Sequence, residues 1–425
     1  MREYSMREQG DARTLLLSCL LAVSFEIFHG NYVVGRRQTT VGLNLITRNA
    51  NERKLALAAN SQPVPDPIED VLVQLFVRLD LQYLSFMEPE ALHAHVSFKP
   101  PDAEKYHKMP ARFSSLHEAR RYWDFSVRPI MNFMNAKAIV EQREQTQNQD
   151  PLVCPFLEKA VPILVPRTEA LMTPFTRVDD WEQLAPVIET TANSTSTCST
   201  TTFSTNNSTN TASKSDQELI SQWSHAFQPI YEASQSPRAK RPSRTRAALL
   251  QLRYQATVIA LSTHSAGGEM QYDRLTSVYE EMVTLAAQIL AHSPATRHEA
   301  VFTLDHGVVA TLFGVASKCR EPAVRRRAIE LLELKPRREG LWEGVVAARF
   351  LRVIVDLEED GLAPGMGTAM GMGSRPVFVP EENRIQLFSM GFDLMRRKGV
   401  LKYVRGPAAV PGNEAKLIQS VVVSW

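Results

Sequence analysis

Apolar residues recur at helical spacing through residues 301–361. A first helix is predicted from apolar residues that return every three or four positions and would share one face: Val301, Leu304, Val308, Leu312 and Val315. Glu321 and Pro322 then start a second helix, because a proline in a first turn loses no backbone hydrogen bond. A third helix ends at Gly361 and carries an apolar face at Leu341, Val345, Ala348, Leu351 and Val355. Three such helices on short turns must bury these faces against one another, which predicts an all-α, multi-helix layered bundle.

The same periodicity predicts helices in the rest of the chain. Ser115 and Glu118 form a capping box, in which a hydroxyl and a carboxylate each accept a free backbone N–H, so a helix should run from Leu116 to about Asn135. The other predicted helices cover residues 15–25, 68–84, 217–231, 245–262 and 272–292. We expect residues 217–231 and 245–262 to pair in antiparallel fashion, as the bundle architecture requires.

A polar segment divides the chain into two helical halves. Of the 24 residues in 190–213, 20 are Ser, Thr or Asn and none is charged, so this segment cannot bury enough apolar surface to offset its ordering entropy. We therefore predict an N-terminal half over 1–186, a disordered linker over 187–216 and a C-terminal half over 217–361. Asn193, Asn206 and Asn207 begin N-x-Ser/Thr patterns, which such a composition produces by chance.

The C-terminal end has a different pattern. Residues 362–383 are predicted to form a loop rich in Gly, Met and Pro. Residues 384–425 are predicted to hold a C-terminal helix and short strands, with a small hairpin between the β-branched runs 400–404 and 417–423.

Composition and charge exclude several classes of protein. The 425-residue chain is 44% apolar with a formal net charge of +2, and residues 296–360 hold eleven Lys or Arg and eleven Asp or Glu, so no basic face for DNA is expected there. The apolar run 15–25 is shorter than the ~20 residues that span a bilayer, so a buried helix is expected, not a membrane anchor or a signal peptide. The scattered cysteines indicate a reducing compartment and show no metal-ligand spacing: Cys19, Cys154, Cys198 and Cys319.

Motifs for catalysis are missing from the sequence. The chain contains neither G-x-S-x-G nor H-E-x-x-H, so the elbow-type hydrolases and the zincins are not indicated. His93 and His95 lie two residues apart in a predicted loop, but a metal site would need a third strong ligand. Asp305 and Glu299 lie near predicted helix starts, where the helix dipole favours carboxylates. We therefore predict that the chain is not an enzyme and holds no cofactor or metal.

Two basic runs remain to be explained. The first has five cations in nine residues without an acid between them, and it suits either a nuclear import signal or a solvated linker: Arg238, Lys240, Arg241, Arg244 and Arg246. The second is Arg325, Arg326 and Arg327, which fan around a helix axis with Glu321, Glu330 and Glu333 nearby. Surface ion pairs are expected for this second run.

Several blocks of sequence resemble the C-terminal regulatory region of fungal zinc binuclear cluster transcription factors. Shorter resembling blocks lie at 15–32, 76–80 and 114–120. The longest and most specific block runs from 302 to 349 and includes Leu304, Asp305, Leu312, Phe313, Lys318, Cys319, Arg320, Arg325, Arg326, Arg327, Arg337, Arg338, Glu339, Gly340, Trp342, Ala347 and Arg349. The blocks follow one another in the order found in that family.

The resemblance implies a nuclear transcription regulator that acts through partner or effector contacts. Members of that family also carry an N-terminal cluster of six cysteines that binds two zinc ions and reads DNA, and no such cluster is present in this sequence. Either the gene is shortened or the DNA reader is lost, so zinc is expected only if an upstream cluster exists. The implied partners are proteins of the transcription machinery, with a homodimer left open, DNA reached only indirectly and no membrane contact. The alternatives are a helical scaffold without a transcriptional role, in the cytoplasm, and, with less support, an enzyme or a secreted glycoprotein.

Overall fold

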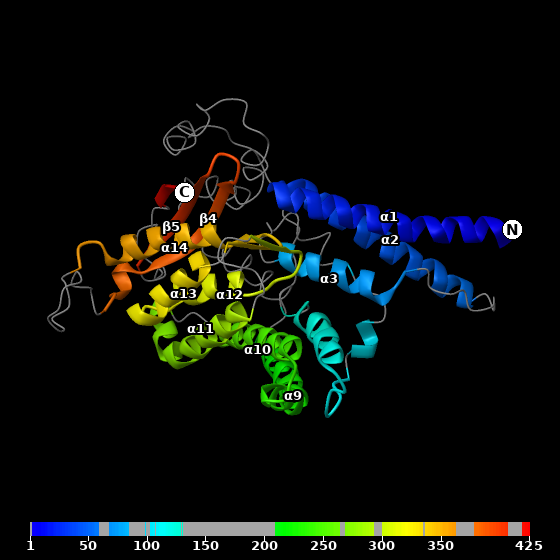
Figure 1. Cartoon of the computed structure of the whole chain (residues 1–425), viewed down its shortest axis with the longest axis horizontal. Coiled ribbons are helices and arrows are strands. Elements are labelled where there is room, and N and C mark those ends of the chain that lie inside the picture. Colours follow the sequence, from blue (N-terminus) through cyan, green and yellow to red (C-terminus); the bar gives the residue numbers. More distant parts are fainter. Residues whose placement is uncertain are drawn as a thin grey trace.

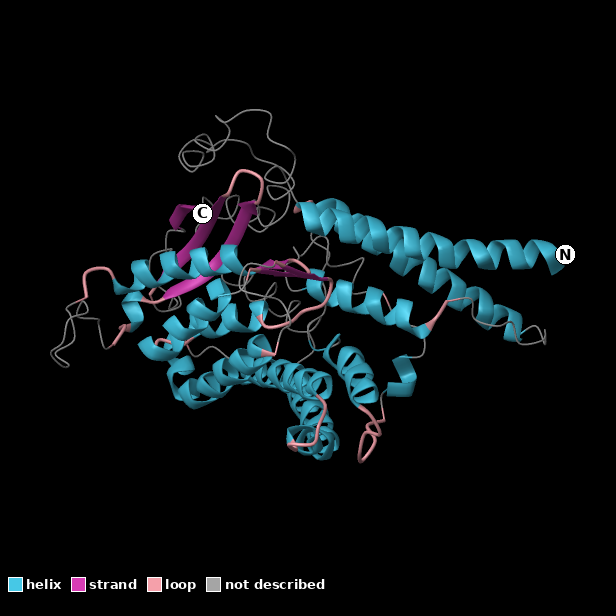
Figure 2. Cartoon of the chain, viewed as in Figure 1, coloured by secondary structure: helices cyan, strands magenta, loops and turns pink. Residues whose placement is uncertain are grey.

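The protein is mainly helical, with two small three-stranded sheets (Figure 2). The computed structural model describes residues 2–58, 68–84, 98, 103–106, 108–128, 130, 209–263, 268–292, 300–334, 336–362, 378–406 and 419–425. Two long N-terminal helices project to one side, while the later helices and both sheets gather in a body at the other side (Figure 1).

The N-terminal part begins with a helical hairpin. α1 (Arg2–His29) and α2 (Tyr32–Ala58) lie side by side and are joined by a short turn at Gly30, whose φ of 85° suits glycine. α3 (Asp70–Leu84) packs against α2, where the missing side chain of Gly42 leaves room for the ring of Phe76. Leu16 of α1, Leu43 of α2 and Leu72 of α3 lie in the same buried cluster as Phe76, so the apolar faces of the three helices meet here.

The predicted helix that begins at Leu116 is confirmed as far as residue 128. Half of its capping box forms as expected, since Glu118 N donates to Ser115 Oγ at 3.1 Å. The Glu118 carboxylate accepts instead from Ser114 N at 2.6 Å, one residue earlier than predicted. The short 3-10 helix η1 (Ala103–Tyr106) precedes this helix.

An aromatic core joins this helix to the C-terminal half. α9 (Thr209–Gln235) and α10 (Arg241–Ser262) pack against each other, and Trp223 of α9 meets Trp123 with ring centroids 4.6 Å apart. The indole Nε1 of Trp223 donates to the carbonyl of Ala119 at 2.9 Å. Phe113 and Phe227 complete the buried centre, so helices from both halves share one core.

The largest core lies among the later helices. η3 (Glu269–Leu275) leads into α11 (Thr276–Ala291), followed by α12 (Val309–Lys318), α13 (Pro322–Leu334) and α14 (Gly344–Glu359). The last three confirm the three predicted amphipathic helices of this region, and Gly361 takes the left-handed φ of 73° expected of a helix stop. The predicted inner face of α11 is also confirmed, because Tyr279, Met282 and Ala286 are buried.

The start of the first predicted helix was wrong. Residues Val301–Thr303 form strand β1, which pairs in parallel with β2 (Arg337–Glu339), and β2 pairs antiparallel with β3 (Trp342–Glu343). Helix α12 begins only at Val309. Apolar spacing cannot separate a short strand and loop from one helical turn, and β-branched residues at 301 and 303 favour the strand.

The C-terminal helix predicted within 384–425 is also wrong for the described residues of that range. They form β4 (Ile385–Asp393), β5 (Lys398–Arg405) and β6 (Gln419–Ser424) in one antiparallel sheet. The predicted pairing of 400–404 with 417–423 is confirmed, since Val400 lies opposite Val422. Burial alternates along β5 with a period of two, which a sheet packed on one face requires.

Two further expectations need correction. α9 begins at Thr209, so the end of the predicted 187–216 linker is helical. In α1, Leu16, Val23 and Ile27 are fully buried, but Leu21 and Phe25 are exposed, so the predicted buried helix is covered on one side only. The α1 segment Ala12–His29 has the length and apolar composition that could span a membrane.

Several predictions fall outside the described residues. They concern the end of the helix near Asn135, the linker over 187–208, the loop over 363–377 and the side chains of His93, His95, Cys154 and Cys198.

Candidate functional site

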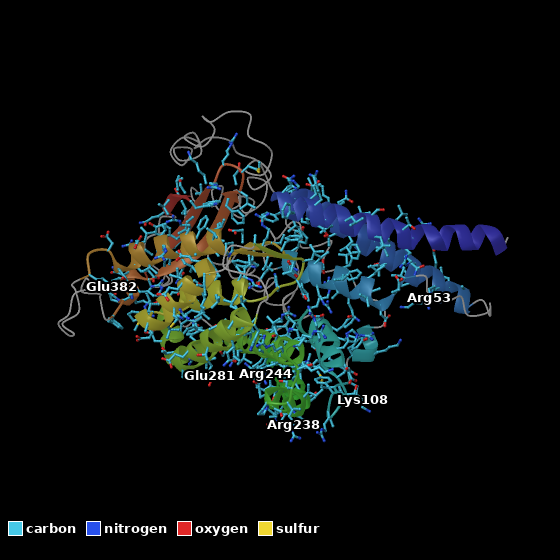
Figure 3. All side chains as sticks on the ribbon, viewed as in Figure 1. Arg53, Lys108, Arg238, Arg244, Glu281 and Glu382 are labelled. Atoms are coloured by element: carbon cyan, nitrogen blue, oxygen red, sulfur yellow. The ribbon has the colours of Figure 1, made fainter. Side chains whose placement is uncertain are left out.

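The candidate import signal lies at the turn between α9 and α10. Arg238, Lys240, Arg241 and Arg246 are exposed, whereas Arg244 is half-buried and donates to the carbonyl of Ser236 at 3.0 Å. Lys240 is the N-cap residue of α10, and Arg241 opens the helix. Figure 3 shows Arg238 at the outer margin of the molecule, so a receptor could reach this turn.

The prediction of surface ion pairs holds for only one residue of the second basic run. Arg327 pairs with Glu330 at 3.2 Å on the surface, as expected. Arg326 instead crosses to α14 and pairs with Glu359 at 2.8 Å. Arg325 is 1% exposed and pairs with Glu358 of α14 at 2.6 Å. Successive helical positions point in different directions, and here one of them points into the core.

Arg325 belongs to a buried group of charges that we call the ion cluster: Glu269, Arg320, Arg325 and Glu358. Arg320 bridges the two acids, with its Nη2 2.9 Å from Glu269 Oε2 and 2.7 Å from Glu358 Oε1. Each of the four side chains is at most 6% exposed. Buried charges of this kind must be paired and hydrogen-bonded, because removing one partner leaves another charge unsolvated.

Further bonds tie the ion cluster to the elements around it. Arg384, next to β4, makes two 2.7 Å contacts with the carboxylate of Asp273 and donates to the carbonyl of Glu269 at 3.0 Å. The backbone N of Ile385 donates to Glu358 Oε1 at 2.7 Å. The ion cluster therefore links η3, α13 and α14 to the C-terminal sheet.

The electrostatics of Glu358 follow from its neighbours. Burial opposes ionisation of this carboxyl, but the charges of Arg325 and Arg320 and the hydrogen bonds it accepts outweigh burial, so its pKa is lowered. The carboxylate is therefore ionised at neutral pH and forms ion pairs with two buried guanidinium groups.

A second polar group, which we call the Asp305 junction, connects the two halves of the chain. Asp305 follows β1 and accepts from Arg120 of the 116–128 helix and, at 3.4 Å, from Arg253 of α10. Arg120 also lies 3.6 Å from Asp124, which pairs with Arg78 of α3 at 2.7 Å. Charges from four separate segments thus meet around the residues that precede α12.

The titration of the Asp305 junction is strongly shifted. Burial would raise the pKa of Asp305, but Arg253 and Arg120 lower it to about 2. Burial and the charge of Arg253 lower the pKa of His306 to about 3, so its imidazole is neutral at physiological pH. Acid–base chemistry near neutral pH would need a pKa closer to 7, which neither group has.

Gln82 and Glu339 hold the backbone around the Asp305 junction. The Gln82 amide donates to the carbonyl of Leu304 at 2.6 Å and accepts from Leu341 N at 3.3 Å. The buried Glu339 carboxylate accepts from Gly307 N at 3.1 Å and from Val309 N at 2.8 Å, so it caps the start of α12. These bonds from remote residues hold 304–308 as a loop instead of a helix.

The long resembling block is distributed over these two polar groups and the core between them. Arg320 and Arg325 belong to the ion cluster, Lys318 pairs with Glu269 at 2.6 Å, and Asp305 lies in the Asp305 junction. Arg349 is exposed. Arg326 pairs with Glu359 of α14, and Arg327 lies on the surface. The remaining members line the core or the strands beside it: Leu304, Leu312, Phe313, Cys319, Arg337, Arg338, Glu339, Gly340, Trp342 and Ala347.

Sequence reasoning missed most of the partners that complete these polar groups. Arg120, Arg253, Gln82 and Glu269 lie far along the chain from the residues they bind, and no local pattern points to them. Glu358 did leave a signal, because it follows Leu351 and Ile354 at helical spacing and so falls on the inner face of α14.

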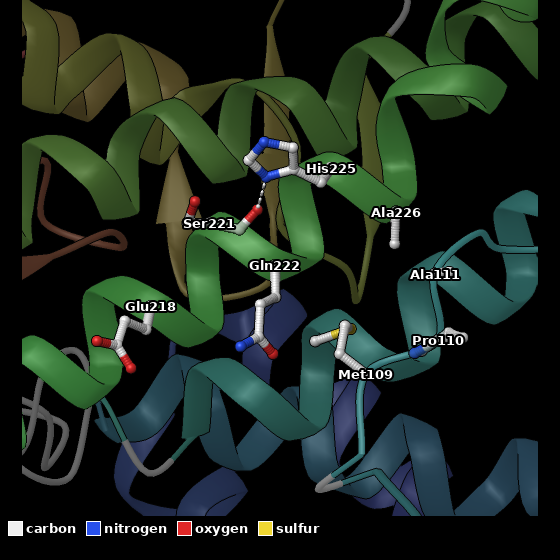
Figure 4. Close-up of a pocket in the computed structure, with 8 residues that line it drawn as sticks. All are labelled: Met109, Pro110, Ala111, Glu218, Ser221, Gln222, His225 and Ala226. Carbon is white, nitrogen blue, oxygen red and sulfur yellow. Dashed lines mark hydrogen bonds between the residues drawn. The ribbon is translucent and has the colours of Figure 1, made fainter.

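A surface pocket lies between α9 and the segment before the 116–128 helix. It has a volume of about 440 Å³ and is lined by Met109, Pro110, Ala111, Glu218, Ser221, Gln222, His225 and Ala226 (Figure 4). The imidazole of His225 bonds the carbonyl of Ser221 at 2.8 Å. Glu218, Gln222 and His225 are exposed, so water competes with any ligand for these groups.

Metal and thiol chemistry find little support in the described part of the chain. No three His, Cys, Asp or Glu side chains of these residues are grouped so that they could hold a metal ion. Cys19 and Cys319 are free and buried, and burial raises the pKa of both thiols, which disfavours the reactive thiolate.

Comparison with known proteins gives one informative similarity. The chain is 32% identical over 117 residues to the aspercryptin biosynthesis cluster-specific transcription regulator atnN of Emericella nidulans. This similarity covers 27% of the chain and 17% of the length of that regulator. No family model matches the chain. No solved structure matches it either.

Proposed function

We propose that the chain is a fungal transcription regulator whose helical module acts through contacts with proteins or with an effector. The observation that carries this proposal is the similarity over 117 residues to the E. nidulans regulator. The mainly helical architecture and the blocks that resemble the zinc cluster factors support the same assignment.

The Asp305 junction and the ion cluster suit a regulatory role better than a catalytic one. Their charged groups are paired with one another, fully buried in the ion cluster and half-buried in the Asp305 junction, so they hold segments together instead of offering themselves to a substrate. A partner or effector that moves one segment of the Asp305 junction would move the others through these bonds. Regulation by contact is therefore the function that this geometry supports best.

Fusion of the full chain to a heterologous DNA-binding domain tests the proposal. We expect transcription from a reporter that carries the matching operator to change several-fold relative to the DNA-binding domain alone. A fusion that accumulates in the nucleus and leaves the reporter at the control level would contradict the regulator assignment.

The zinc cluster relationship makes a separate prediction about the chain by itself. Without six clustered cysteines, the purified protein should contain no stoichiometric zinc and should not bind operator DNA specifically at physiological salt. Elemental analysis and a footprinting assay measure the two properties. Two zinc ions per chain, or a protected operator, would overturn this part of the proposal.

We also propose nuclear localisation through the turn between α9 and α10. Replacing the exposed cations Arg238, Lys240, Arg241 and Arg246 with alanine should shift a fluorescent fusion toward the cytoplasm, whereas Arg244 is kept because it binds Ser236. The control replaces Arg397 and Lys398, two exposed cations where the chain enters β5. Equal distributions for the two variants would contradict the import signal.

A further inference from the structure

Four exposed apolar side chains form one continuous surface at the end of α1. Leu21, Phe25 and Phe28 are 71%, 59% and 55% exposed, and Phe302 of β1 is 38% exposed. Leu21, Phe25 and Phe28 follow one another at four- and three-residue spacing, so they share one face of α1. Phe28 meets Phe302 edge to face with ring centroids 5.4 Å apart, which joins the helix to the sheet. We call these four residues the aromatic patch.

His29 and Arg338 border the aromatic patch. The His29 ring lies 4.1 Å from Phe25 and 5.5 Å from Phe28, measured between ring centroids. The Arg338 guanidinium carbon lies 5.7 Å from the Phe28 centroid, and this side chain donates to the carbonyl of Phe28. Large exposed apolar surfaces of this kind mark interaction sites, and aromatic residues with arginine dominate the binding energy of interfaces.

Charge around the aromatic patch selects the kind of partner. Residues 21–40, which hold the α1 part of the aromatic patch and the turn that follows it, carry two cations (Arg36 and Arg37) and one acid (Glu26). Glu26 accepts from Asn31 at 2.8 Å, and Arg338 adds a third cation beside Phe28. A second copy of this hairpin would bring like charges together, whereas an acidic partner is attracted.

The size of the aromatic patch indicates a helical peptide. The α1 residues of the aromatic patch span seven helical steps, which is about 10 Å at the usual helical rise. This matches the two turns over which an amphipathic helix presents residues i, i+3 or i+4, and i+7 to a surface.

We propose that the aromatic patch binds an acidic amphipathic helix of a partner protein. The apolar face of that helix would cover Leu21, Phe25 and Phe28, and its carboxylates would lie near Arg338 and the cationic hairpin. This inference rests on the proposed function, because it names the class of protein that the regulatory module would bind. Binding is measured with purified protein, so its outcome is independent of the reporter assay.

The test uses a fluorescein-labelled synthetic peptide with Leu and Phe at helical spacing and Glu elsewhere, titrated into the full chain by anisotropy. Leu21→Ser and Phe25→Ser should each weaken binding about tenfold, as truncation at an interface centre does. Leu55→Ser is the matched control, because Leu55 is also 71% exposed but lies near the other end of α2, and it should leave affinity within about twofold.

Other probes separate the competing occupants. The same peptide with Lys in place of Glu should bind at least about tenfold more weakly, since its charges repel the hairpin. Equal affinity for both peptides, or for the wild type and Phe25→Ser, would overturn the proposal. Sedimentation that shows a dimer lost in Phe25→Ser would assign the aromatic patch to a second copy, and binding to anionic vesicles that Phe25→Ser abolishes would assign it to a membrane. Either result would overturn the proposal that the aromatic patch binds an acidic helix.

Discussion

The α1–α2 hairpin and the region from α12 to α14 distribute polar and apolar side chains in opposite ways. In α1, Leu21 and Phe25 are exposed, although the helix is apolar enough in composition to span a membrane. In α13 and α14, Arg325 and Glu358 are buried although each is charged. The first region leaves apolar groups in water, and the second removes charges from it.

The difference follows from how many neighbours each region has. Among the described elements, α3 packs on the hairpin where Leu16 and Phe76 are buried, whereas α1 is left uncovered at Leu21 and Phe25. The helices α12 to α14 are enclosed by α11 and by both sheets, so a charged residue at an inner position cannot reach solvent. An inner charge is then tolerated only when its partner lies in the next element, as Glu358 does for Arg325.

The largest effect is expected from removing a charge in the ion cluster. Glu358→Gln leaves Arg320 and Arg325 buried without their shared carboxylate, and breaking such a pair costs about 3–5 kcal/mol of unfolding free energy. Urea denaturation measures the loss. Glu330→Gln removes the exposed pair with Arg327 and should cost about 0.5 kcal/mol or less. Similar losses for the two variants would mean that burial does not distinguish the pairs.

A smaller effect is expected from filling the space between α2 and α3. Gly42→Ala would push a methyl group into the ring of Phe76, and overpacking of this kind costs about 1–3 kcal/mol. Gly314→Ala in α12 is the matched control, since an added Cβ there meets no atom within 4 Å. Alanine in an exposed helical position stabilises by up to about 1 kcal/mol, so the two variants should change stability in opposite directions.

The Asp305 junction should make stability depend on pH. The folded pKa of Asp305 is lowered to about 2, so its contribution is complete above the unfolded pKa of about 4 and is lost as pH falls through the folded value. The lowering of the pKa from 3.8 to about 2 corresponds to at most about 2.5 kcal/mol, and to less because the side chain is 30% exposed. In Asp305→Asn the unfolding free energy should therefore fall less steeply between pH 5 and 2, because the carboxyl with the lowered pKa is absent. An unchanged slope would show that Asp305 does not carry this charge coupling.

The sequence predicted the helices better than it predicted the contacts between them. Amphipathic spacing correctly located α3, α11, α13 and α14, because each repeats its apolar face over several turns. It failed at residues 301–308, where a three-residue strand and a loop copy the spacing of a helix. The loop is fixed by Gln82 and Glu339, which are remote in sequence.

The candidate site shows the same limit. Arg325 was expected on the surface, since Glu330 and Glu333 offer local partners, yet its partner Glu358 comes from the next helix. Local pairing rules describe an isolated helix, whereas a packed helix turns one side toward the core whatever residues stand there. The aromatic patch was missed for the converse reason, because apolar spacing does not tell which of two apolar faces a neighbour will cover.

The smallest effect on stability is expected in the hairpin, where it tests the comparison most directly. Leu21→Ser changes a side chain that is 71% exposed, so the unfolding free energy should stay within about 0.5 kcal/mol of the wild type. Leu16→Ala, one and a half turns earlier on the buried side, should cost about 2–5 kcal/mol. Urea denaturation of both variants compares the two faces of one helix. A large loss in Leu21→Ser would mean that this face is covered in solution, and the contrast between an open hairpin and an enclosed body would fail.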